Sequence, residues 1–267
     1  MMLTVETYPT LAEAAGRLGP DATFLGGGTL VMRDANFARP GLSRIVRTTD
    51  RGHSAIQAEG ARIRIGAGVT MAGIVAHPDL RFLAPVAARV GGPAVRNMGT
   101  VGGNLFAPHP YGDLATALLA LDGQARLSDG SALGLGDLLA RRTHLSALVE
   151  SVSIARPAGD DFRFRKVARV KPKGVSVMAI AAWLPRPTGR IQGARVAYGA
   201  MAETPVRVPA VEQALEGVPL ETGGIARALS VATEGLSPPD DALASAWYRR
   251  EVAPVHLRRL LLNEGER

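Results

Sequence analysis

Two glycine-rich segments constrain the fold of this chain more than any other feature of its sequence. The first is FLGGGT, residues 24–29. The second is RNMGTVGGNLFAPHPYGDL, residues 96–114, which contains four glycines and two prolines. Glycine has no Cβ, so it adopts positive φ readily and lets backbone N–H groups converge on an anion. The two segments therefore mark places where the backbone turns sharply or comes very close to another group.

The first segment allows two interpretations. Residues 26–28 form either a plain tight turn or a cradle for a phosphate, with the hydroxyl of Thr29 as an added donor. The second segment repeats this pattern of threonine and paired glycines and adds an asparagine, in Thr100, Gly102, Gly103 and Asn104. Two such segments suit a diphosphate ligand whose two halves are held by different loops.

Neither segment matches a standard nucleotide-binding signature. The sequence has no G-x-x-x-x-G-K-[ST] motif. It also has no G-x-G-x-x-G between a strand and a helix with an acidic residue about 20 positions later. The stretch GAGVTMAG, residues 66–73, imitates part of the second motif with the wrong spacing. A P-loop or an ordinary dinucleotide-binding domain is therefore not predicted.

Side chains that usually carry catalysis are sparse. The chain has no cysteine, which excludes disulfides, thiolate metal sites, protein-ligated iron–sulfur clusters and cysteine nucleophiles. The five histidines are scattered outside any H-E-x-x-H pattern, and no G-x-S-x-G motif supplies a serine nucleophile. His109 lies inside the second glycine-rich segment, where we expect a loop histidine at the rim of a site. We predict no catalytic side chain and no metal site.

The net charge of +7 raises the question of nucleic-acid binding. However, the 31 basic residues are spread along the chain and only three of them are lysines. Aromatic residues make up 4% of the sequence and do not alternate with basic ones, as a base-stacking surface requires. We therefore predict no nucleic-acid partner.

One short stretch concentrates cationic residues, namely Arg163, Arg165, Lys166, Arg169, Lys171 and Lys173. We predict that most of it is the solvent-exposed edge strand of a sheet. The alternative is that these side chains contact a cofactor or an acidic partner subunit.

The sequence also bears on location. The N-terminal residues lack the basic stretch and apolar run of a secretory signal, and the longest apolar runs are much shorter than the roughly 20 residues of a membrane-spanning helix. The mean hydropathy is +0.10 and hydrophobic residues make up 46% of the chain. We predict a soluble, cytoplasmic protein with no membrane partner.

Hydrophobic periodicity predicts a chain of mixed strands and helices in three parts. Residues 1–55 read as strand, helix and further strands, with Thr10 as the N-cap of the helix. Residues 56–158 alternate strands and helices, and Asp113 is predicted to cap the helix LATALLAL. Residues 159–267 read as a meander of strands followed by helices.

The last helix carries a possible interaction face. Ala244, Tyr248, Val252 and Val255 are spaced so that they share one side of the helix. We predict that this side contributes to contact with a partner chain, and that Pro254 kinks the helix.

Several segments, in order along nearly the whole chain, resemble the FAD-binding subunit of the molybdenum hydroxylases. These are the relatives of xanthine dehydrogenase, carbon monoxide dehydrogenase and aldehyde dehydrogenase. The segments are LGGGT, IGAGVTMAGI, AVRNMGTVGGNLFAPHPYGDLATALLALD, ESVSIARP with FRFRKVARV, ARVAYGAMAETPVRVPAVEQAL and WYRREVAPVHLRRLL. The resemblance implies an α+β FAD-binding fold of the vanillyl-alcohol-oxidase type. Two N-terminal α+β subdomains, residues 1–55 and 56–158, would hold FAD between them. A C-terminal α+β domain, residues 159–267, would close over the flavin side.

The resemblance also implies roles for single residues. Residues 26–29 and 100–104 would hold the pyrophosphate, Asp113 would fix the adenosine or ribityl region, and Lys166 would lie near the flavin. The chain departs from the family at Leu30, where an aspartate is common. The full set of cofactor-binding residues is Leu25, Gly26, Gly27, Gly28, Thr29, Leu30, Asn97, Thr100, Gly102, Gly103, Asn104, Asp113 and Lys166.

The implied function is electron transfer inside a heterotrimer. A molybdopterin-binding subunit would hydroxylate the substrate, and a [2Fe–2S] subunit would deliver electrons one at a time to FAD on this chain. The flavin would pass them to NAD or another acceptor. One alternative is a free-standing FAD-dependent oxidoreductase that acts directly on a small substrate. Another is a non-enzymatic nucleotide binder without flavin.

Overall fold

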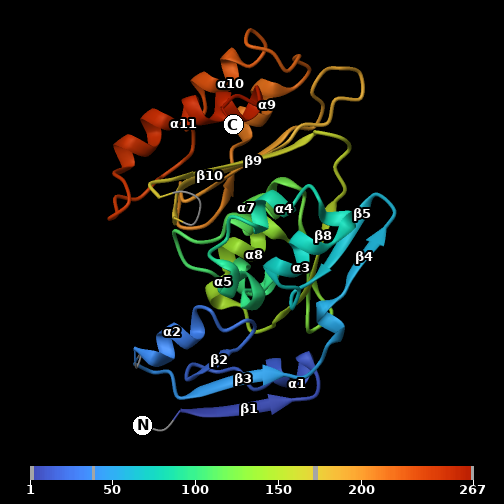
Figure 1. The fold of residues 1–267 in the computed structure, drawn as a ribbon, viewed down its shortest axis with the longest axis vertical. Coiled ribbons are helices and arrows are strands. Elements are labelled where there is room, and N and C mark those ends of the chain that lie inside the picture. The colour runs from blue at the N-terminus through green and yellow to red at the C-terminus, as the bar shows by residue number, and fades with distance from the viewer. Residues whose placement is uncertain (1–2, 38–39, 171–173, 266–267) are drawn as a thin grey trace.

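The computed structural model describes residues 3–37, 40–170 and 174–265, and within these residues the strands form three sheets (Figure 1). Each sheet falls within one of the three parts expected from the sequence, while the boundaries between the parts stay a prediction. In Figure 1 the sheets follow one another along the long axis of the molecule, and the five-stranded sheet lies between the other two.

A parallel three-stranded sheet with the order β1–β3–β2 opens the chain. Its elements are β1 (Thr4–Tyr8), α1 (Leu11–Ala15), β2 (Ala22–Phe24), α2 (Val31–Asn36) and β3 (Arg44–Thr48). In the central strand, Ile45 pairs with Val5 on one side and with Thr23 on the other. Thr10 caps α1 because its hydroxyl oxygen accepts a hydrogen bond from the N–H of Glu13 at 3.1 Å. The predicted start of this helix is confirmed.

The middle part is built on a five-stranded antiparallel sheet with the order β4–β5–β8–β6–β7. Its strands are β4 (Ile56–Glu59), β5 (Arg62–Gly66), β6 (Gln124–Leu127), β7 (Ala132–Gly134) and β8 (Val149–Ala155). Its α-helices are α3 (Met71–Ala76), α4 (Ala84–Ala87), α5 (Pro93–Met98), α6 (Val101–Leu105), α7 (Asp113–Ala120) and α8 (Leu135–Arg141). Short 3-10 turns lie at η1 (Gly52–Ser54), η2 (Pro78–Leu80) and η3 (Arg142–His144). Ile63 and Ile65 are fully buried on one face of β5, as the alternating sequence RIRI predicts.

The C-terminal part contains an antiparallel sheet with the order β12–β11–β10–β9. Its elements are β9 (Phe162–Ala168), β10 (Ser176–Trp183), β11 (Arg195–Gly199), β12 (Val206–Arg207), α9 (Pro209–Leu215), α10 (Ala226–Ser230) and α11 (Ala246–Leu261). Strand β10 is buried along nearly its whole length because α7 contacts it from one side and α11 from the other (Figure 1). Its continuous apolar run SVMAIAAW is what such two-sided burial requires.

Helix α7 joins the middle part to the C-terminal sheet. Every residue of α7 is buried, and the helix contacts both β10 and β11. A Cβ added to Gly199 on β11 would overlap the hydroxyl of Thr116 on α7, so helix and strand approach as closely as glycine allows. The core of the middle part therefore continues into the C-terminal sheet, where it includes Ala181 and Ala197.

The cationic strand β9 lies at the edge of its sheet, but most of its charged side chains are not solvated. Arg163 donates to the backbone carbonyl of Leu261, and Arg165 donates to the carbonyl of Glu264. The last carbonyls of a helix have no partner within the helix and carry partial negative charge, so they attract cations. The C-terminal end of α11 therefore binds one face of β9, which the sequence alone does not reveal.

The predicted solvated edge is also wrong for Lys166, whose side chain is 7% exposed on the opposite face of β9. It holds for Arg169, which is exposed and donates to the carbonyl of Ala242 at 3.3 Å. Lys171 and Lys173 lie outside the described residues.

Helix α11 exposes part of the face that the sequence singles out. Tyr248 and Val255 are 43% and 49% exposed, while Ala253 and Leu257 on the other side are fully buried against the sheet. Ala244 precedes the first helical residue, and the helix continues through Pro254. The prediction of partner contact through this face stays untested.

Within residues 3–37, 40–170 and 174–265, no helix is long and apolar enough to cross a membrane. In the same residues no three histidine, aspartate or glutamate side chains are grouped to hold a metal ion.

The central position of α7 gives a stability prediction. Leu118 is fully buried on this helix, so Leu118→Ala removes apolar contacts and leaves a cavity in the core to which α7 belongs. We expect the free energy of unfolding in urea to fall by about 2–5 kcal/mol. Val75→Ala on the exposed side of α3 is the control and should change it by less than about 1 kcal/mol. Equal effects of the two changes would show that α7 is not a central packing element.

Candidate functional site

The first glycine-rich segment leaves the sheet at the end of β2. The N–H of Leu25 donates to the carbonyl of Val46 at 2.7 Å, which is the last contact with β3. Gly28 has φ of 75°, a conformation that favours glycine, and its carbonyl accepts the N–H of Met32 at the start of α2. The segment is therefore a sharp strand-to-helix turn.

The backbone N–H groups of this turn are free. In the part of the chain that the structure describes, the N–H groups of residues 26–29 donate no hydrogen bond. Gly26 and Thr29 are exposed. Backbone donors without a partner bind water or a ligand, so the turn can hold an anion.

The second glycine-rich segment forms the short helix α6. Thr100 is its N-cap, and the hydroxyl oxygen accepts a hydrogen bond from the N–H of Gly103 at 3.1 Å. The N–H of Gly102 donates to the carbonyl of Ala67 at 2.8 Å, and a Cβ on Gly102 would lie 3.1 Å from the Ala67 Cβ. Neither glycine has positive φ. These glycines therefore permit close packing, and their N–H groups are not free to bind a ligand.

The two segments lie against each other, although some seventy residues separate them in the sequence. A Cβ on Gly27 would overlap the carbonyl oxygen of Met98, and a Cβ on Gly26 would lie 3.0 Å from the Thr100 hydroxyl. In the described residues the Thr100 hydroxyl donates to no acceptor. The free N–H groups of the first segment and this hydroxyl therefore border one place, as predicted for two loops that grip one ligand.

Three other predicted residues lie within or next to the two segments in the sequence. Asn97 is exposed on α5, and its amide has no partner among the residues described. Leu30 is the N-cap of α2 and makes no side-chain hydrogen bond there, whereas an aspartate would accept one. Asn104 accepts the N–H of Ala115 at 2.9 Å and so caps α7 from the preceding helix.

Asp113 is the first residue of α7 and not its cap, so that prediction is wrong. Its carboxylate is 2.8 Å from the ammonium of Lys166 and accepts the hydroxyl proton of Ser176 at 2.6 Å. Lys166 also donates to the carbonyl of Arg89 at 2.9 Å. The Asp113 and Lys166 side chains are 8% and 7% exposed, so this buried ion pair ties the middle part to the C-terminal sheet. Because Lys166 on β9 binds the Asp113 carboxylate, Asp113 does not cap α7, and the side chain of Asn104 caps this helix instead.

Sequence reasoning missed several residues at this site. Ser176 completes the Asp113 pair, and Arg142 donates to the carbonyls of Leu105 and Ala107 at 3.1 and 2.8 Å, directly after α6. Burial lowers the pKa of Arg142 despite the nearby charge of Glu203. Nothing in the sequence pairs these residues, because each contact joins segments more than 30 residues apart.

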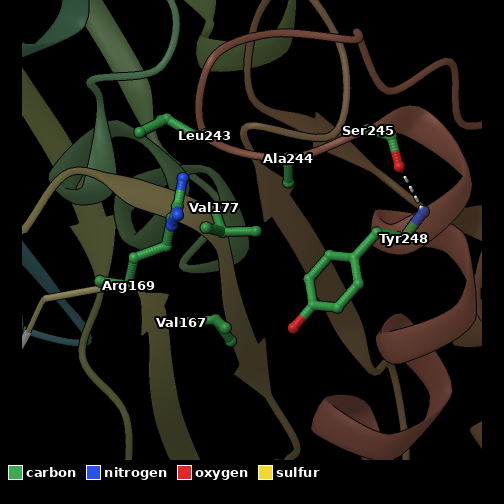
Figure 2. A pocket seen from close by; sticks show the side chains of 8 residues that line it. Val167, Arg169, Val177, Leu243, Ala244, Ser245 and Tyr248 are labelled. Carbon is green, nitrogen blue, oxygen red and sulfur yellow. Dashed lines mark hydrogen bonds between the residues drawn. The ribbon is translucent and has the colours of Figure 1, made fainter.

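A cavity of about 250 Å³ lies elsewhere, between β9, β10 and the start of α11. Figure 2 shows the Tyr248 ring directed toward Val167 and Val177 across this space. Val167 projects from the face of β9 opposite to Lys166, because side chains alternate along a strand, and Arg169 follows directly after the strand ends. None of the predicted cofactor-binding residues lines this cavity, so it is separate from the glycine-rich site.

Comparison with known families matches two stretches of the chain. Residues 2–152 match the family described as FAD binding domain in molybdopterin dehydrogenase. Residues 163–263 match the CO dehydrogenase flavoprotein C-terminal domain. The range of the first match contains both glycine-rich segments, and the range of the second contains Lys166.

Individual relatives agree. The chain is 28% identical to the glyceraldehyde dehydrogenase medium chain of Sulfolobus acidocaldarius over 62% of its length and 61% of that chain. It is also 28% identical to the nicotinate dehydrogenase FAD-subunit of Eubacterium barkeri over 95% of its length and 93% of that chain. A crystal structure of Cu,Mo-CO dehydrogenase in its cyanide-inactivated form has the same fold. Its TM-score is 0.88 at 23% identity, over 98% of this chain and 96% of that one. The α+β fold predicted from the sequence is therefore confirmed.

The family assignment rests on more than half of the chain, because the first match alone spans residues 2–152. The cofactor of that family is FAD, which suits a turn with free N–H groups beside a threonine hydroxyl. The protein belongs to the FAD-binding flavoprotein subunits of the molybdenum hydroxylases.

Proposed function

We propose that this subunit transfers electrons within a multi-subunit molybdenum hydroxylase. It would take them from a [2Fe–2S] partner and pass them through FAD to NAD or another acceptor, while a molybdopterin-binding partner hydroxylates the substrate. The observation that carries the proposal is the contact between the two glycine-rich segments, which suits one diphosphate. A heterotrimeric assembly and a cytoplasmic location belong to the same proposal.

The residues at this contact fit the FAD pyrophosphate. The free N–H groups of residues 26–29 offer several donors to phosphate oxygens, and the Thr100 hydroxyl offers another. A Cβ at Gly26 would lie 3.0 Å from the Thr100 hydroxyl and a Cβ at Gly27 would overlap the Met98 carbonyl, so a side chain at either position would disturb the contact. Gly102 and Gly103 would support the cradle without binding the phosphates. Their N–H groups already donate to the Ala67 carbonyl and the Thr100 hydroxyl oxygen.

The rim of the cradle fits the ring systems of the same cofactor. Met32, Met98, Phe106 and Tyr111 are between 38% and 56% exposed, and all lie within or next to the two glycine-rich segments. Large apolar side chains that gather at one place on a surface usually mark a contact. Planar rings of FAD would cover them, as apolar side chains line most cofactor sites.

The other predicted residues would position the cofactor. Leu25 and Leu30 flank the turn, and the free amide of Asn97 would bind a polar group of FAD. Asn104, Asp113 and Lys166 would support the site without contacting FAD. Asn104 caps α7, and the Asp113–Lys166 pair joins the middle part to the C-terminal sheet.

FAD would supply the redox chemistry, because a flavin accepts electrons singly and releases them as a pair. The side chains described above bind and orient, and none of them needs to give or take a proton. The position of the cradle and the packing of the C-terminal sheet over it would then set the electron-transfer distance and the flavin environment.

The direct test is the visible spectrum of the purified chain. We expect the absorption of an oxidised flavin, release of FAD on denaturation, and no hydroxylation of any substrate by the chain alone. A colourless protein that takes up no added FAD would contradict flavin binding. Substrate hydroxylation by the isolated chain would contradict the role of an electron-transfer subunit and favour a free-standing oxidoreductase.

The contact between the segments gives a first prediction. Gly27→Ala places a methyl group on the carbonyl of Met98, so the first segment has to move away from the second. We expect FAD affinity, measured by fluorescence titration of the apoprotein, to fall at least tenfold, which equals about 1.4 kcal/mol.

The control for this change is Gly223→Ala, where an added Cβ meets nothing within 4 Å and φ is not positive. It should leave FAD affinity within about twofold of the unchanged protein. If Gly27→Ala retained full affinity as well, the two segments would not form the cradle.

The buried ion pair gives a second prediction. Asp113→Ala leaves the ammonium of Lys166 buried with the Arg89 carbonyl as its remaining acceptor among the described residues, so we expect the free energy of unfolding to fall by about 3–5 kcal/mol. Asp113→Asn should cost less, because its amide oxygen still accepts hydrogen bonds. The measurement is urea unfolding, combined with the FAD content of each purified variant.

Two further variants control for this result. Adding Lys166→Met to Asp113→Ala removes the unpaired charge and should restore part of the lost stability. Glu59→Ala breaks an exposed pair with Arg64 and should cost less than about 1 kcal/mol. A cost for Asp113→Ala as small as that for Glu59→Ala would refute the structural role of the buried pair.

A further inference from the structure

The loop between α6 and α7, residues 106–112, is held at both ends. At its start, Arg142 binds the carbonyls of Leu105 and Ala107. At its end, Asp113 forms the buried pair with Lys166. The loop therefore leaves the second glycine-rich segment and returns to α7 between two fixed points.

The middle of this loop is held by a third contact, to the C-terminal part. The Nε2 atom of His109 lies 2.8 Å from the Oδ2 atom of Asp241, in the segment between α10 and α11. An ionised carboxylate can only accept, so the Nε2–H of His109 is the donor. Both side chains are partly open to water, with 22% of His109 and 24% of Asp241 exposed.

Asp241 is a fixed anchor. Its Oδ1 atom accepts from Arg249 at 2.7 Å and from the N–H groups of Leu243 and Ala244 at 2.8 and 3.1 Å. Burial would raise the pKa of Asp241, but the bonds from His109 and these donors outweigh it and lower the pKa to about 2. The carboxylate is therefore charged at neutral pH.

Arg249 ties this anchor to the core of the C-terminal part. Its side chain is fully buried on α11, and it also donates to the carbonyl of Ala200 at 2.7 Å, directly after β11. A carboxylate held by four donors from three segments has little freedom to move. The position of Asp241 is therefore set by the C-terminal fold, and His109 follows it.

The loop is also continuous with the segment that forms the proposed cofactor site. It begins directly after α6, whose Thr100 faces Gly26, and it carries Phe106 and Tyr111, which are 38% and 39% exposed. Movement of the loop would move both aromatic rings relative to the glycine-rich contact.

We infer that His109 is a positioning residue for the flavin, and that its bridge to Asp241 fixes the aromatic loop of residues 106–112 beside the cofactor. The inference rests on the proposed function, because it needs FAD at the glycine-rich contact. It assigns His109 no proton transfer and no contact with the reacting atoms. The bridge makes the shape of the cofactor site depend on how the C-terminal part packs.

The consequences are specific because the bridge is more open to water than the Asp113–Lys166 pair at the end of the loop. The Asp113–Lys166 pair is buried, so its loss affects the fold as a whole. Loss of the half-open His109 bridge frees the middle of the loop, while Asp241 keeps its bonds to Arg249 and the backbone. We therefore expect the flavin to respond more than the stability does.

The test compares His109→Ala with His109→Gln. The Gln side-chain amide can donate from nearly the place of the imidazole Nε2–H, so His109→Gln rebuilds the bridge, whereas His109→Ala abolishes it. For His109→Ala we expect FAD dissociation about tenfold faster, an altered visible spectrum and reduction potential of the bound flavin, and a nearly unchanged urea midpoint. His109→Gln should return all three flavin readouts toward those of the unchanged protein.

His144→Ala is the matched control, because His144 is exposed and has no partner in the described residues. His109→Asn covers the possibility that the alanine variant folds poorly, since it keeps a polar side chain too short to reach Asp241. Unchanged FAD dissociation and spectrum in both His109→Ala and His109→Asn would overturn the inference. So would a His109→Gln variant as impaired as His109→Ala. If the unchanged protein bound no FAD, the proposed function would fail first and this inference with it.

Discussion

The contact of the Gly27 backbone with Met98 is the constraint on which the rest of the site depends. It brings a turn with free N–H groups against the N-terminus of α6, and any side chain at Gly27 would prevent it. A second close approach supports it from the other side. A Cβ on Gly66 or Gly68 would overlap the segment of His53, which links the first sheet to the middle part. The turn at Ala67 between them packs on Gly102. Close backbone contacts therefore connect the segment of His53, through Ala67 and Gly102, to the contact between the two glycine-rich segments.

A different kind of contact joins the C-terminal part to this arrangement. Buried or half-buried polar side chains bridge the two parts at Asp113 with Lys166, at Asp122 with Arg195, and at His109 with Asp241. Apolar packing of α7 on β10 and β11 supplies the burial, and these polar contacts fix the orientation, because hydrogen bonds depend on distance and angle. Removing one partner of the buried Asp113–Lys166 pair costs more than the pair contributes, since it leaves a charge without compensation. The orientation of the C-terminal sheet on the middle part is thus set by polar groups within an apolar interface.

Much of the local structure could be predicted from the sequence, whereas the partners of polar residues could not. Three local signals predict structure that is present. These are the alternation in RIRI, the cap at Thr10 and the turn at FLGGGT. Asp113 looks like a helix cap because its neighbours do not reveal a lysine on a strand 53 residues later. Arg163 and Arg165 resemble a solvated edge because the end of α11 lies almost 100 residues away. The glycines of the second segment suggest positive φ, but Gly102 does not have it. Gly102 is glycine because a side chain there would crowd Ala67.

The charge of the chain leads to one more conclusion about the site. The net charge is +7, but residues 24–30 and 97–112, which form the cradle and its loop, contain no lysine or arginine. Arg96, the nearest basic residue in the sequence, donates instead to the carbonyls of Ala88 and Gly91. The pyrophosphate would therefore be held by backbone dipoles and hydroxyl groups rather than by ion pairs. Dipolar donors of this kind act over short range, so salt screens them much less than it screens exposed charges. Binding of FAD then depends on the precision of the backbone contact, and the excess of arginine serves the joints between parts and the outer surface.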